Sequence, residues 1–156
     1  MNKIEKITLK IEVDDNPDLS YLGEYSDTPA ERHIDRQERG DKEDGEYRYF
    51  NLGYGDPEYL EQDYERAEAY NRGEWYMFGI IAKVEVSYER DDYKRLETLS
   101  SGGLWGIESD SGTYIREAAK QQLAELEEHL KRFNVDLGNF EKLADKALED
   151  FERGIK

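Results

Sequence analysis

Two clusters of carboxylates in this sequence could in principle hold a divalent metal ion. The first comprises Asp14, Asp15 and Asp18, and the second comprises Glu108 and Asp110. Oxygen ligands of this kind suit magnesium, manganese or calcium and could serve a hydrolase. Neither cluster has the Asp-x-Asp-x-Asp-Gly loop with a distant Glu that characterises an EF-hand. We prefer to interpret both as turn and cap residues, with Asp110, Ser109 or Ser111 capping a following helix.

The chain has few residues that could support nucleophilic catalysis. There is no cysteine, which excludes disulfides, thiolate metal sites and a cysteine nucleophile. The two histidines are His33, in a charged segment, and His129, in an expected helix. A Ser-His-Asp triad needs a histidine held by a buried acid, and nothing in the sequence marks either histidine in that way. These observations favour a non-enzymatic protein without a cofactor.

The segment 100–112, SSGGLWGIESDSG, is rich in glycine and leads into an expected helix. Such a segment can offer backbone N–H groups to an anion. It lacks the Lys-Ser/Thr pair of a Walker loop, and Glu108 and Asp110 place negative charge where a phosphate would lie. We therefore predict a glycine-rich bend that lets Trp105 pack.

The composition is strongly acidic, with 38 Asp and Glu against 22 Lys and Arg and a net charge of −16. A negative surface repels a phosphate backbone, so direct binding to nucleic acid is disfavoured, whereas basic partners are attracted. Those partners include proteins that themselves hold DNA or RNA. The alternative is that the acidity only keeps the protein soluble. The 12 tyrosines, five phenylalanines and two tryptophans indicate a folded domain despite the low apolar content.

The elements that must position these residues follow from the hydrophobic periodicity. Strict alternation predicts a strand over 7–13, and a hydrophobic run predicts the central strand over 75–88, followed by a hairpin turn at 90–92 and a partner strand at 93–99. A short strand is expected at 47–52. Apolar residues three or four apart predict helices over 57–71, 113–133 and from residue 140 on. Residues 19–45 show no period, and we expect a long, irregular or mobile loop.

Together these elements predict an α+β fold, with a small antiparallel sheet of about four strands packed by two to three helices. We expect a single core in a domain of residues 1–135, and a C-terminal helix in 136–156 that docks on the domain or on a partner. Through that helix a homo-oligomer could also form. The chain has no apolar run long enough for a signal peptide or a membrane span, so a cytoplasmic location without membrane contact is expected.

Several stretches together resemble a widespread family of small uncharacterised proteins of phages, prophages and plasmids. In chain order they are SYLGEYSD (20–27), IDRQERGD (34–41), EYRYFN (46–51), the segment from EQDYER (61–66) to NRGEW (71–75), and LSSGGLWGIESD (99–110). The resemblance spans about residues 5–135 and leaves the final helix outside. It brings no established chemistry, so no functional residue can be carried over from the family.

The resemblance implies a setting in which small acidic proteins block host defences by presenting DNA-like charge. We therefore expect an accessory protein of a phage or mobile element that binds a host protein in the host cytoplasm. A nucleic-acid-binding effector complex is the candidate partner, and the activity would be anti-CRISPR or anti-restriction. The candidate interaction residues are Trp105, Glu108, Asp110, Glu117, Glu125, Glu128, Glu141, Asp145, Glu149 and Glu152.

Two alternatives to this hypothesis remain open. The helical carboxylates could simply form i,i+4 pairs with neighbouring lysines on a solvated surface. In that case the acidity carries no recognition. The chain could also be a carboxylate-metal hydrolase or a small-ligand-binding domain that uses the two metal-type clusters.

Overall fold

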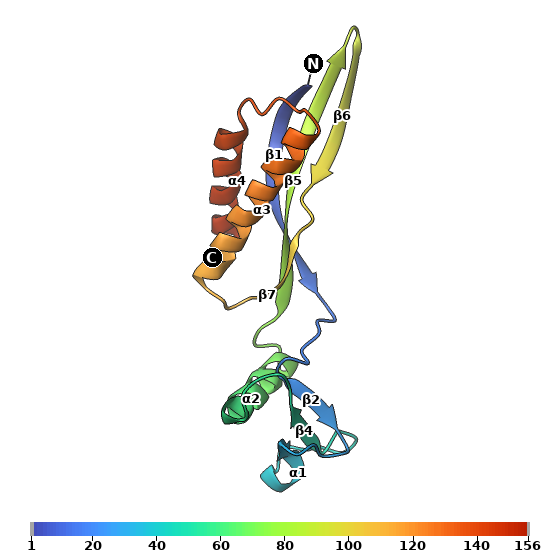
Figure 1. The fold of residues 1–156 in the computed structure, drawn as a ribbon, viewed down its shortest axis with the longest axis vertical. Coiled ribbons are helices and arrows are strands. Elements are labelled where there is room, and N and C mark those ends of the chain that lie inside the picture. Colours follow the sequence, from blue (N-terminus) through green and yellow to red (C-terminus); the bar gives the residue numbers. More distant parts are fainter. Residues whose placement is uncertain (1, 156) are drawn as a thin grey trace. The chain divides into compact units, whose positions relative to one another are not determined.

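The computed structural model describes residues 2–155 and divides the chain into two compact units (Figure 1). One unit combines the segment up to Asp15 with the segment from Met77 to the C-terminus, and the other is Asn16–Tyr76. This division differs from the predicted boundary between residues 135 and 136 and from the predicted single core. The physical reason is that the C-terminal helix shares the core of the first unit, whereas residues 16–76 form a separate small sheet.

The sheet of the first unit is antiparallel and four-stranded, as predicted, and its central strand is β5 (Met77–Arg90). On one side β5 pairs along its length with β1 (Asn2–Asp14). On the other side it pairs with β6 (Tyr93–Ser100) and then with β7 (Leu104–Glu108). The α+β class is therefore confirmed, and β1 lies at one edge of the sheet.

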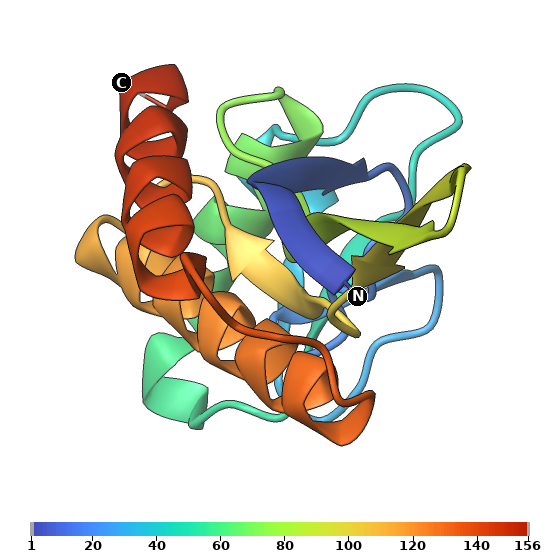
Figure 2. The same ribbon diagram turned by 90° about the horizontal axis from the view of Figure 1, so that it is seen from above.

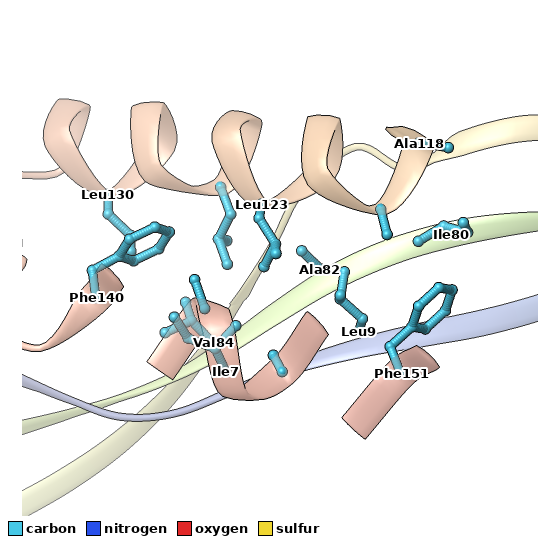
Figure 3. Packing of buried hydrophobic residues seen from close by; sticks show 14 of the residues in the cluster. Ile7, Leu9, Ile80, Ala82, Val84, Ala118, Leu123, Leu130, Phe140 and Phe151 are labelled. Carbon is cyan, nitrogen blue, oxygen red and sulfur yellow. The ribbon is translucent and has the colours of Figure 1, made fainter. Parts of the chain in front are cut away.

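The helices α3 (Thr113–Arg132) and α4 (Phe140–Gly154) lie together on one side of this sheet (Figure 2). Figure 3 shows Phe140 and Phe151 of α4 and Leu123 and Leu130 of α3 facing the apolar side chains of β1 and β5. Each helix presents one apolar stripe, because its buried residues recur three or four positions apart. The C-terminal helix thus packs on its own chain.

The second unit holds a three-stranded antiparallel sheet in the order β2-β4-β3. Its elements are β2 (Gly23–Ser26), β3 (His33–Asp35), α1 (Arg36–Arg39), β4 (Tyr49–Leu52), the 3-10 turn η1 (Pro57–Tyr59) and α2 (Leu60–Asn71). The expectation of an irregular or mobile loop over 19–45 was wrong, because β2, β3 and α1 fall inside it. The Asp35 carboxylate caps α1 by accepting hydrogen bonds from the backbone N–H groups of Gln37 and Glu38.

Within the glycine-rich segment the structure has the strand β7 where a bend was predicted, and Trp105 packs against β5 while remaining 47% exposed. A Cβ atom added to Gly79 would lie 2.4 Å from Cε3 of Trp105, so the indole ring rests directly on the backbone of β5. The predicted side-chain cap of α3 was wrong, since the N-cap residue is Gly112 and no side chain accepts a cap hydrogen bond there. The Ser111 hydroxyl instead donates to the Glu108 carbonyl at 2.7 Å.

Substituting Gly79 with alanine should displace the Trp105 ring, because the new methyl group would overlap it. We expect a loss of about 1–3 kcal/mol in unfolding free energy, as for other overpacking substitutions. Urea denaturation of wild type, Gly79→Ala, Trp105→Ala and the double variant measures this. In the Trp105→Ala background the Gly79 substitution should cost little, and an equal cost in both backgrounds would contradict the contact.

Candidate interaction surface

The structure does not bring the two metal-type clusters together. Asp14 is opposite Met77 in the sheet, and Met77 is in turn opposite Glu108, so β5 separates the two carboxylates. Asp18 belongs to the second unit. Within residues 2–155 there is no group of three or more His, Asp or Glu side chains that could hold a metal ion. The geometry therefore gives the metal-hydrolase alternative no support.

The predicted acidic residues of α3 and α4 lie on the surface of the first unit, but most of them form ion pairs with cations nearby. The pairs are Glu117 with Lys120, Glu128 with Lys131, Glu149 with Arg153, and Glu152 with Arg116, and Glu125 lies 3.9 Å from Nε2 of His129. The helix α3 contains four acidic residues and four Lys and Arg, and α4 contains five acidic residues and three Lys and Arg. Glu141 and Asp145 are exposed on α4. These two helices therefore hold little of the chain's excess charge.

The remaining predicted residues lie elsewhere in the first unit. Trp105 is in β7 and is 47% exposed, Glu108 ends that strand, and Asp110 lies in the turn that follows. The Glu125 carboxylate accepts hydrogen bonds from the Gly102 N–H and from Gln122 Nε2. It thus holds the glycine-rich segment against α3, and this contact is structural.

The excess negative charge is concentrated in residues 16–76, which we call the acidic unit. This unit carries 17 Asp and Glu against seven Lys and Arg, a net charge of −10, whereas the first unit carries 21 against 15, a net charge of −6. Its exposed acidic residues are Asp18, Glu24, Asp27, Glu31, Glu38, Asp41, Glu43, Asp44, Glu46, Asp56, Glu58, Glu61, Glu65 and Glu74.

Four arginines of the acidic unit, Arg36, Arg39, Arg48 and Arg72, form ion pairs inside it, and Arg36 is the clearest case. The Arg36 side chain is only 4% exposed. Its Nε donates to the Tyr64 hydroxyl at 3.3 Å, one terminal nitrogen donates to the Tyr47 carbonyl at 2.6 Å, and the other lies 3.1 Å from Glu68 Oε1. Its guanidinium carbon also lies 5.1 Å from the centre of the Tyr25 ring.

The electrostatics of this network follow from its burial. Burial opposes the charge of Arg36, but the hydrogen bond with Tyr64 and the negative charge of Glu68 outweigh it and raise the Arg36 pKa. Burial also raises the pKa of the Tyr25 and Tyr64 hydroxyls above the usual tyrosine range. Both tyrosines therefore remain neutral at physiological pH, and Tyr64 donates to the Asp41 carboxylate at 2.8 Å.

Two further arginines tie acidic side chains of the unit together. Arg39 lies 2.7 Å from Glu61 and 3.2 Å from Glu65, both on α2. Arg48 binds Asp35 through Nε at 3.1 Å and through a terminal nitrogen at 2.8 Å, and this hydrogen bonding lowers the Asp35 pKa. Because these guanidinium groups face carboxylates of their own unit, the rest of the carboxylates dominate its surface.

A small pocket opens beside this network. It has a volume of about 270 Å³ and is lined by Tyr25, Arg36, Glu46, Tyr47 and Asn71. The Asn71 amide donates to the Tyr25 hydroxyl at 3.0 Å, and Tyr47 is 54% exposed. Two aromatic rings and the Glu46 carboxylate are groups that could contact a basic side chain of a partner.

Sequence reasoning placed the candidate interaction residues on the two C-terminal helices and in the segment from Trp105 to Asp110, and placed none of them in the acidic unit. A charge count by segment, rather than over the whole chain, would have pointed to residues 16–76. It would not have shown that Arg36 is buried.

Comparisons of the chain with protein-family models, with curated proteins and with solved structures give no match. Within residues 2–155, no helix has the length and apolarity needed to cross a membrane. The functional argument therefore depends on the chain's own residues and sequence motifs.

Proposed function

We propose that this chain is a non-enzymatic accessory protein of a phage or other mobile element that binds a nucleic-acid-binding host protein through the acidic unit. The observation that carries the proposal is the net charge of −10 in residues 16–76, where 14 acidic residues are exposed and arginines of the unit pair with only five of them, Asp41, Glu46, Glu61, Glu65 and Glu74. The resemblance of residues 5–135 to phage, prophage and plasmid proteins supplies the biological setting. A defence complex of the host is the expected partner.

The mechanism is competition for a basic surface. A protein that binds DNA neutralises phosphates with Lys and Arg, and its affinity falls steeply with salt. Carboxylates on a folded unit can form ion pairs with the same Lys and Arg residues. Unlike DNA, they offer no bases to pair and no phosphodiester bond to cleave. Electrostatic complementarity of this kind accelerates association and selects basic partners. The partner would then be unable to hold nucleic acid while it holds the acidic unit.

Two variants that each lose four negative charges test this proposal. The first neutralises the acidic unit through Glu24→Gln, Glu31→Gln, Asp44→Asn and Glu58→Gln. The matched control neutralises the C-terminal helices through Glu117→Gln, Glu128→Gln, Glu141→Gln and Asp145→Asn. All eight side chains are exposed. Tagged wild type and both variants are used to capture proteins from a bacterial lysate at low and high salt, with mass spectrometry of what is retained.

We expect wild type to retain a nucleic-acid-binding protein at low salt and to release it at high salt or on addition of duplex DNA. The acidic-unit variant should bind that protein about tenfold more weakly, since each exposed charge pair contributes up to about 1 kcal/mol. The helix variant should bind almost as wild type does. The reverse order would move the interaction surface to α3 and α4, and equal binding by all three would exclude charge mimicry.

A further inference from the structure

The edge strand β1 is a second candidate binding site, because in the described part of the chain one of its two edges has no hydrogen-bonded neighbour strand. Twelve of its 13 residues pair with β5 on one side, and within residues 2–155 no strand pairs with it on the other. An edge strand presents a row of unpaired backbone N–H and C=O groups, and most proteins keep such edges short or distorted. A bulge interrupts β1 between Ile4 and Lys6, but from Lys6 to Asp14 the pairing with β5 is regular.

An apolar groove runs along this edge between β1 and the C-terminal part of α4. It has a volume of about 400 Å³, and its apolar lining includes Ile7, Leu9, Ile11, Ala147, Phe151 and Ile155. Figure 3 shows Leu9 of β1 beside Phe151 of α4 in this region. Ile155 is 42% exposed, so the groove is open to solvent at the end of α4.

We infer that the occupant of this edge is a second copy of the same chain, paired antiparallel through β1 about a two-fold axis at Leu9. In this register Lys6 lies opposite Glu12 of the second copy, and Glu12 lies opposite its Lys6. Ile7 faces Ile11 of the second copy on the side of the sheet that carries α4. Opposite charges across a strand pair and apolar pairs on the same face both stabilise antiparallel pairing.

The charges of β1 also disfavour the neighbouring registers. An axis at Thr8 places Lys6 opposite Lys10 of the second copy, and an axis at Lys10 places that lysine opposite itself. Like charges directly opposite one another destabilise a sheet. A shift that pairs residues of opposite parity would turn the apolar face of one copy against the polar face of the other. Of the registers centred from Thr8 to Lys10, the one at Leu9 is thus the favoured one.

This inference is independent of the proposed function, because it uses residues of the first unit and the proposed function uses residues 16–76. It does not depend on a host partner. The pairing would join the two four-stranded sheets into one continuous sheet with both pairs of helices on the same side.

Charge exchange across the pair tests the inference. Sedimentation equilibrium of the full chain is measured for wild type, Lys6→Glu, Glu12→Lys and the double variant, from micromolar to submillimolar concentration. The matched control is Lys94→Glu, because Lys94 on β6 faces Glu89 of β5 as Lys6 on β1 faces Glu85 of β5. The control therefore repeats the loss of a cross-strand pair within one chain without touching the β1 edge.

We expect wild type and Lys94→Glu to have a mass of twice 18.3 kDa at the upper concentrations. Each single β1 variant should dimerise at least tenfold more weakly, and the double variant should recover the dimer, because it restores opposite charges in both pairs. Circular dichroism checks that each variant is folded. A monomeric wild type at all concentrations would overturn the inference, as would single variants that remain as dimeric as wild type.

Discussion

Replacing Arg36 with methionine should lower the unfolding free energy by about 3–5 kcal/mol, the cost of removing one member of a buried, charged network. Methionine fills a similar volume but donates no hydrogen bond. The Tyr47 carbonyl, the Tyr64 hydroxyl and the Glu68 carboxylate would each lose a donor or a counter-charge. Since these groups come from α2 and from the segment before β4, the substitution should loosen the whole acidic unit.

The measurement is urea denaturation followed by tryptophan fluorescence in a Trp105→Phe background. Trp75, which is 2% exposed and belongs to the acidic unit, is then the fluorescent reporter. The matched control is Arg32→Met, because Arg32 is exposed in the same charged segment, and it should change the unfolding free energy by about 0.5 kcal/mol or less. If Arg36→Met cost no more than Arg32→Met, the network would not be what holds the unit together.

The sequence could predict those elements in which a regular spacing of hydrophobic residues continues over a long segment. The alternation over 7–13 and the apolar run over 75–88 give β1 and β5, and the 3.6-residue period over 113–133 gives α3. In each case the buried face is made of many apolar residues, so a single irregular position does not hide the pattern. The hairpin turn at Asp91 and Asp92 was found for the same reason, since it lies between two recognisable strands.

The acidic unit could not be predicted in this way, for two physical reasons. Its strands and its first helix are three or four residues long, which is too short for a period to show. Its core is also partly polar, and a buried arginine cannot be told from an exposed one by residue type. Arg32, Arg36 and Arg39 look equivalent in the sequence, but only Arg36 is buried, because Tyr64 and Glu68 of α2 reach it from 28 and 32 residues away.

The candidate surface was misplaced for a related reason. Carboxylates on the two predicted helices could be assigned to exposed positions from periodicity, so they attracted the hypothesis. The ion pairs that neutralise them become visible only in the structure, as with Arg116, which reaches Glu152 on the neighbouring helix at 2.8 Å. A surface carboxylate can attract a basic partner only if no neighbouring cation already neutralises it. Which cations are neighbours depends on how the helices pack.

Replacing Gln122 with leucine should lower the unfolding free energy by about 2–4 kcal/mol, because it leaves a buried hydroxyl donor and a half-buried amide donor unpaired. Gln122 is 1% exposed, and its Oε1 accepts from the Ser101 hydroxyl at 2.7 Å and from the Gly103 N–H at 3.0 Å. The Ser101 hydroxyl in turn accepts from the Ala82 N–H at 3.0 Å. Through these bonds α3 is fastened to β5 and to the start of β7.

Urea denaturation measures the cost, and hydrogen exchange of the Gly103 amide should show a specific loss of protection at the site. Gln121→Leu is the matched control, since Gln121 is exposed on the same turn of α3 and the substitution should be nearly neutral. Adding Ser101→Ala to Gln122→Leu should recover no stability, because it removes one unpaired donor but also removes the acceptor of the buried Ala82 N–H. A Gln122→Leu variant as stable as wild type would mean that water or a rearranged segment 101–103 replaces these bonds, and that the network does not fix the position of β7.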